Sequence, residues 1–115
     1  MGSMICHCRT CRRVSAAPTV AWVTFPSDRF AIVQGEPAQF SSSQEVRRTF
    51  CPYCGTPLTY ERRDEPQSID ITTCSLDEPD AFAPTHHSWI GHDIGWMRSC
   101  DNLPKYPKSR HDPNT

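Results

Sequence analysis

The stretch Cys6-His7-Cys8-Arg9-Thr10-Cys11 places three thiols within six residues, and Arg12 and Arg13 follow at once. Thiolates are strong, soft ligands for Zn²⁺, and this spacing lets one tight backbone turn point all three sulfurs at a single metal, at about 2.3 Å each. We therefore predict a zinc site at Cys6, Cys8 and Cys11.

The stretch supplies only three of the four ligands of a tetrahedral site. A structural zinc site fills all four positions with protein atoms, whereas a catalytic or ligand-binding zinc keeps one position open. A fourth protein ligand would close the site as a structural knuckle, and the candidates are His7, Cys74, Cys100 and the later histidines. The spacing alone leaves both kinds of site open.

Length and composition favour a small metalloprotein. With 115 residues there is room for one domain, 1–115. Domains of small size often need a disulfide or a bound metal for stability in addition to a hydrophobic core. Five of the seven cysteines lie in CxC or CxxC clusters, which favours a reduced, cytoplasmic metalloprotein over a disulfide scaffold. The net charge of −1 argues against nucleic-acid binding, and no apolar run approaches the ~20 residues that span a bilayer, so we expect a soluble protein.

Short runs of β-branched and aromatic residues between proline and glycine turns predict a mainly-β domain. Residues 1–3 are set aside as an expression scar or a late start. A helical turn after the first cysteines should be short, and the proline-rich tail, about 103–115, should lie along the surface or be disordered. The expected strands are 20–25, 30–34, 38–42, 46–50, 58–61 and 68–73.

Two further features bear on function. Arg47 and Arg48 are adjacent on an expected strand, so their side chains should face opposite sides, and one can point toward the site. Cys51-Pro52-Tyr53-Cys54-Gly55 is typical of a zinc knuckle, although a CxxC can also be a redox pair. His86 and His92 are candidates for a site, but such histidines more often pack against a sheet edge with satisfied ring nitrogens.

An ordered set of motifs runs from Cys6 to about Pro107: Cys6-His7-Cys8-x-x-Cys11-Arg12-Arg13, Ala17-Pro18, Trp22, Gly35-Glu36, Ser41-Ser42, Arg48-x-Phe50-Cys51-x-x-Cys54-Gly55-Thr56-Pro57-Leu58, Ser75-Leu76-Asp77-x-Pro79, Pro84, His87, Trp96 and Asp101-x-Leu103-Pro104. In this set the chain resembles the glutathione-dependent formaldehyde-activating enzyme family, whose domain is shared with centromere protein V. The resemblance implies a β-tent fold of small antiparallel sheets and a three-cysteine zinc site that binds glutathione or a similar thiol in carbon-sulfur lyase chemistry.

By this resemblance Cys6, Cys8 and Cys11 match the family's catalytic zinc ligands, and Cys51 and Cys54 match half of its structural zinc site. The other half, an upstream CxC, has no counterpart in the sequence. Either that metal is lost, or replacements such as Cys74 or Cys100 complete the site, or the sequence is a fragment. A sheet that is one or two strands short would expose an edge, which a homodimer could cover.

The chemistry of the residues agrees with the resemblance. Three thiolates leave Zn²⁺ a poor activator of water, yet an open position on this soft centre can take a fourth thiol and hold it as a nucleophile beside an aldehyde. Addition to formaldehyde would give an S-hydroxymethyl thioether. Arg12, Arg13 and Arg48 are candidate partners for the carboxylates of glutathione. The sequence thus predicts such an enzyme, and the alternative is a non-catalytic zinc module that binds a protein or nucleic acid.

Overall fold

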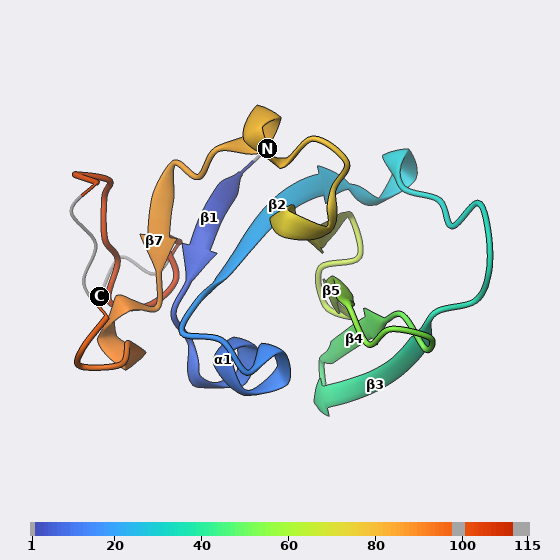
Figure 1. Cartoon of the computed structure of the whole chain (residues 1–115), viewed down its shortest axis with the longest axis horizontal. Coiled ribbons are helices and arrows are strands. Elements are labelled where there is room, and N and C mark those ends of the chain that lie inside the picture. The colour runs from blue at the N-terminus through green and yellow to red at the C-terminus, as the bar shows by residue number, and fades with distance from the viewer. Residues whose placement is uncertain (1, 98–100, 112–115) are drawn as a thin grey trace.

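The chain folds into one bent, seven-stranded sheet with a single short α-helix, in a computed structural model that describes residues 2–97 and 101–111. The strands stand in the order β3-β4-β5-β6-β2-β1-β7. Figure 1 shows β1, β2 and β7 on one side, β3 to β5 on the other, and α1 between them. The elements are β1 (Ser3–Cys6), α1 (Arg9–Ser15), β2 (Val20–Pro26), η1 (Ser27–Arg29), β3 (Ala38–Ser43), β4 (Val46–Phe50), β5 (Pro57–Arg62), β6 (Ser68–Thr72), η2 (Thr73–Ser75), η3 (Pro79–Phe82), β7 (His86–Ser88) and η4 (Ile90–His92).

The expected mainly-β class is confirmed, and five of the six expected strands are present. The strand predicted at residues 30–34 is wrong. Both long edges of β2 are already paired, to β6 and to β1, and Val33 is 94% exposed. The apolar side chains of this segment therefore have no strand to pack beside.

The sequence reading missed β1 and β7. Setting residues 1–3 aside was an error, because the Gly2 carbonyl accepts a hydrogen bond from the Thr24 amide and Ser3 begins β1. The sheet is also not purely antiparallel, since β1 runs parallel to β7. The β1 strand thereby lies between β2 and β7 and carries the metal-binding stretch at its end.

The described part of the tail, residues 103–111, runs beside β7. Backbone bonds join His87 to Pro104 and Tyr106, and the Gly91 amide donates to the Pro107 carbonyl at 2.9 Å. Cys100 and the end of the tail, 112–115, lie outside the described residues.

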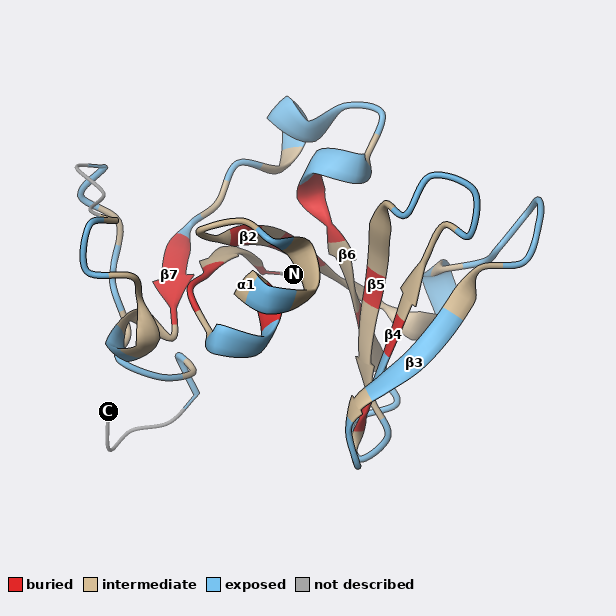
Figure 2. Ribbon diagram, turned by 60° about the horizontal axis from the view of Figure 1, so that its bottom comes forward, coloured by how far each residue is buried: buried red, intermediate tan, exposed pale blue. Residues whose placement is uncertain are grey.

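The two faces of the sheet differ sharply in character. One face carries Trp22, Arg48, Tyr60 and Asp70 in adjoining cross-strand pairs. The other face carries Val23 and is covered in part by η3. Phe82 at the end of η3 makes an edge contact with Phe25 of β2, and the two ring centroids lie 5.6 Å apart. Figure 2 shows that the outer strand β3 is largely exposed.

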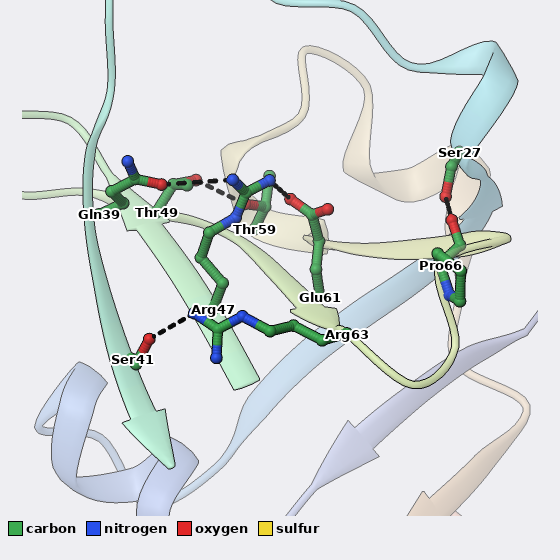
Figure 3. A network of polar contacts seen from close by, with 9 residues as sticks. All are labelled: Ser27, Gln39, Ser41, Arg47, Thr49, Thr59, Glu61, Arg63 and Pro66. Atoms are coloured by element: carbon green, nitrogen blue, oxygen red, sulfur yellow. Dashed lines mark hydrogen bonds and ion pairs between the residues drawn. The ribbon is translucent and has the colours of Figure 1, made fainter. Parts of the chain in front are cut away.

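Arg47 and Arg48 point to opposite faces, as strand alternation predicted. Arg47 is exposed and bonds to Gln39 and, at 2.8 Å, to Glu61 on the neighbouring strands (Figure 3). Arg48 is only 4% exposed and turns inward. The inward face therefore receives a buried cation from the centre of β4.

Candidate metal centre

Three elements of local structure bring the thiols together. Cys6 ends β1, Cys8 is the N-cap of α1, and Cys11 lies in the first turn of that helix. The Cys11 amide donates to the Cys8 Sγ at 3.3 Å, and the His7 amide donates to the Ser88 carbonyl of β7 at 2.9 Å. Strand, turn and helix thus fix the backbone on both sides of Cys8.

The thiols have the chemistry and nearly the spacing of a zinc site. The sulfurs of Cys6, Cys8 and Cys11 all lie within 4.8 Å of one another. Tetrahedral ligands at 2.3 Å from Zn²⁺ stand about 3.8 Å apart, so a small inward movement completes the set. Among residues 2–97 and 101–111, no other side chain that could bind a metal joins this group. These three residues can therefore hold a metal ion.

Two of the three thiols are also part of the hydrophobic core. Cys6 and Cys11 are each 4% exposed and cluster with Val20 and Trp22. Burial of this kind excludes bulk water from two of the three sulfurs. Cys8 is the most exposed of the three, being half-buried.

Hydrogen bonds among the thiols decide which one carries negative charge. Hydrogen bonds from Cys11 and then Cys6 lower the pKa of Cys8, whereas hydrogen bonds with Cys11 and Cys8, and then burial, raise the pKa of Cys6. Arg48 adds a further attraction that lowers the pKa of Cys8. These interactions favour the thiolate form at Cys8 over that at Cys6.

Arg48 is the cation of the site. Its Nη1 and Nη2 lie 3.7 and 3.6 Å from the Cys11 Sγ, and its Nε donates to the Ser42 hydroxyl at 2.9 Å. The guanidinium stacks over Tyr60, 4.9 Å from the ring centroid, with Trp22 at 6.0 Å. These contacts hold a positive charge against the sulfurs from inside the protein, where it is weakly screened.

A chain of hydrogen bonds supports the loop that carries Cys6, His7 and Cys8. His7 Nε2 lies 2.9 Å from His87 Nδ1, and His87 Nε2 lies 2.8 Å from a carboxylate oxygen of Asp101. The backbone amide of Leu103, and then His87, lower the pKa of Asp101 to about 2, so this carboxylate accepts and His87 donates to it. His87 Nδ1 then accepts from His7, which leaves His7 Nδ1 a buried acceptor without a partner. His7 thus braces the loop and does not join the sulfurs.

The sulfurs open onto a cavity of about 860 Å³ lined by the inward face of the sheet, the start of α1, η4 and the tail. Of the predicted carboxylate partners, Arg13 and Arg48 line this cavity. Arg12 does not line it; its Nη1 donates to the His92 carbonyl at 3.0 Å and ties α1 to η4.

Residues 1–92 match the protein family described as "Glutathione-dependent formaldehyde-activating enzyme". The chain belongs to this family. The resemblance seen in the sequence is confirmed, and family membership suggests glutathione-related formaldehyde chemistry at a site that can hold a metal.

A solved structure of similar fold is that of a Rhodobacter sphaeroides protein determined as a Northeast Structural Genomics target. The two share 20% sequence identity with a TM-score of 0.55, over 65% of this chain and 68% of that one. This likeness supports the fold of this formaldehyde-activating enzyme family member. No curated protein matches the chain.

The second cysteine pair of this family member lies apart from the cavity, in the turn between β4 and β5. Gly55 adopts a φ of +79° there, and its amide donates to the Cys51 carbonyl, as a knuckle turn requires. Cys54 is exposed and contacts the Thr56 hydroxyl at 3.0 Å. Within the described part of the chain, no third metal-ligating side chain joins the pair. Metal binding by Cys51 and Cys54 stays a prediction.

Several residues of the cavity were not identified from the sequence. Tyr60 and Asp70 line it because they stand beside Arg48 in the register of β4, β5 and β6, a relation that sequence spacing does not reveal. Trp89 lines it too. His86 and His92, which the sequence offered as candidates, both line the cavity, and the ring centroids of Trp89 and His92 lie 5.1 Å apart. Helices long and apolar enough to cross a membrane do not occur in the described residues.

Proposed function

We propose that this protein binds glutathione or a similar thiol at a zinc ion held by Cys6, Cys8 and Cys11, and forms or cleaves its S-hydroxymethyl adduct with formaldehyde. One observation carries the proposal: three converging sulfurs open onto a large cavity, and a buried arginine lies against them. The activity proposed is that of a carbon-sulfur lyase.

In the forward direction the thiol sulfur forms a bond to the carbon of formaldehyde, and the thiol proton ends on the former carbonyl oxygen. The reverse direction breaks the same carbon-sulfur bond and returns the proton to sulfur. Zinc bound at the site would lower the pKa of the incoming thiol and supply it as a nucleophile.

The residues of the chain have separate roles in this proposal. Arg48 stabilises negative charge on the sulfurs from the buried side, and Arg13 meets a carboxylate of the thiol from the exposed side of the cavity. Arg12 acts indirectly, because it anchors the η4 turn that carries His92 and follows Trp89. The half-buried Cys8 faces the side from which the thiol enters.

The test is to replace zinc with Co²⁺ and to titrate the protein with glutathione. Entry of a thiol into the metal shell changes the thiolate-to-metal charge-transfer spectrum, and Arg13→Gln should weaken the response without loss of metal. The exposed Arg29→Gln, outside the cavity, is the matched control.

Absence of any spectral change up to millimolar glutathione would refute the proposal. A non-catalytic zinc module predicts that result together with salt-dependent association with nucleic acid.

A further inference from the structure

Asp70 is an acidic residue on a cavity wall that is otherwise rich in arginine. The cavity is lined by Arg9, Arg13, Arg48, Arg62 and Arg110. Asp70 nevertheless forms no ion pair with any of the described residues; the Thr24 hydroxyl donates to its Oδ1 at 2.6 Å. Its second carboxylate oxygen is therefore available to a ligand.

The surroundings of Asp70 favour the arrival of a cation. Burial raises the pKa of Asp70, the Thr24 hydrogen bond opposes this, and the charge of Glu65 raises it further. Glu65 lines the same cavity. A ligand ammonium group at this point would offset the cost of holding a desolvated carboxylate beside a second one.

Strand register gives the spacing between Asp70 and Arg48, whose guanidinium contacts the Cys11 sulfur. Arg48 pairs with Tyr60, and Tyr60 pairs with Asp70, so the three side chains stand in one row across β4, β5 and β6. Neighbouring strands lie about 4.8 Å apart, which places Asp70 roughly 10 Å from Arg48. Because Arg48 contacts the Cys11 sulfur, this spacing approximates the length that a thiol ligand needs to extend from the cysteine cluster to Asp70.

That reach selects among thiols. In cysteine three bonds join sulfur to the amine, a reach of roughly 4 Å, whereas the eight bonds of a γ-glutamyl-cysteine unit reach roughly 9 Å when extended. A γ-glutamyl thiol can thus occupy the metal centre with its sulfur and meet Asp70 with its amine.

We propose that Asp70, oriented by Thr24, binds the α-ammonium group of a γ-glutamyl thiol whose sulfur lies at the cysteine cluster. This inference rests on the proposed function and names the part of the substrate that sets specificity. Asp70 then makes the cavity selective for a thiol peptide with a free amine over a simple thiol. The arginines on the same wall are left for the carboxylates.

The experiment compares glutathione with glutaryl-cysteinylglycine, which lacks only the γ-glutamyl amino group. Binding of each thiol to the zinc protein is measured by calorimetry, for the unchanged protein, for Asp70→Asn and for Asp28→Asn. Asparagine keeps the oxygen that accepts from Thr24, and Asp28 is exposed on η1, outside the cavity. The unchanged protein should bind glutathione about tenfold more tightly than the analogue, and Asp70→Asn should abolish that difference by weakening glutathione alone.

Equal binding of the two thiols by the unchanged protein would overturn the inference and leave the proposed function intact. An equal loss of affinity for both thiols in Asp70→Asn would also overturn the inference. Failure of the unchanged protein to bind either thiol would overturn the proposed function and this inference together. The comparison of ligands in the unchanged protein needs no variant, so the test holds even if Asp70→Asn folds poorly.

Discussion

Replacement of Arg48 by methionine should weaken metal binding strongly, because it removes a buried positive charge that touches the Cys11 sulfur. Three thiolates on Zn²⁺ leave the centre a net charge near −1, so its pairing with Arg48, which lies 3.6 Å from the Cys11 sulfur, is worth about 5 kcal/mol at an effective dielectric constant of 20 before desolvation. Hydrogen bonds to charged groups retain roughly 1.5–3 kcal/mol after that cost. Zinc affinity should therefore fall by about 10- to 100-fold.

The neighbouring arginine supplies the control. Arg47→Met makes the same chemical change one residue away, on the opposite face, where the guanidinium bonds to Glu61 at the surface. It should leave zinc affinity unchanged. Arg48→Lys keeps the charge but loses the planar stack on Tyr60 and the hydrogen bond to Ser42, so its affinity should fall between those of the native protein and Arg48→Met.

Competition with a chromophoric chelator at fixed pH measures the zinc affinity of each variant, and the melting temperature shows whether the fold is kept. Equal affinities for Arg48→Met and Arg47→Met would refute the electrostatic argument. Equal zinc affinities for Arg48→Lys and Arg48→Met would also refute it, because the geometry of the guanidinium and not its charge would then explain the loss of affinity.

Three other predictions test separate parts of the structure. Elemental analysis should find close to one zinc per chain, and Cys8→Ser should lose it along with much of the stability; a full zinc complement in that variant would exclude the site. Below about pH 4 the unfolding free energy should fall as the depressed pKa of Asp101, about 2, is approached, because protonation weakens its bond to His87; Asp101→Asn should remove that part of the pH dependence in urea titrations. Gly91→Ala should release the tail to proteolysis, since a Cβ there would lie 2.8 Å from a backbone oxygen, whereas Gly95→Ala, with open space around it, should not.

The sequence predicted the features that depend on local spacing. The cysteine cluster converges because its three residues span one turn, and strand alternation correctly separated Arg47 from Arg48. The missed features depend on which strands become neighbours. Asp70 enters the cavity only through the pairing of β5 with β6 and of β6 with β2. No spacing along the chain encodes that order.

The errors have the same origin. Residues 30–34 have the composition of a strand, but a strand also needs an unpaired neighbour, and β2 has both edges occupied. Residues 1–3 were set aside because their composition does not reveal the contacts they make; the Ser3 carbonyl accepts a hydrogen bond from the Thr85 amide, 82 residues along the chain. Patterns in a single sequence depend on the composition of a segment and do not show which other segments it packs against.

The parallel pairing of β1 with β7 also bears on the order of assembly. During synthesis the three thiols emerge well before the Ser88 carbonyl that anchors the His7 amide, and before the His87 ring, which lies 80 residues after His7. The nascent chain can thus take up its metal while one flank of β1 is still bare. A metal bound at that stage would tether the first strand and the first helix as one unit, onto which β7 later docks. The cavity beside the three sulfurs would then be completed around an ion already in place.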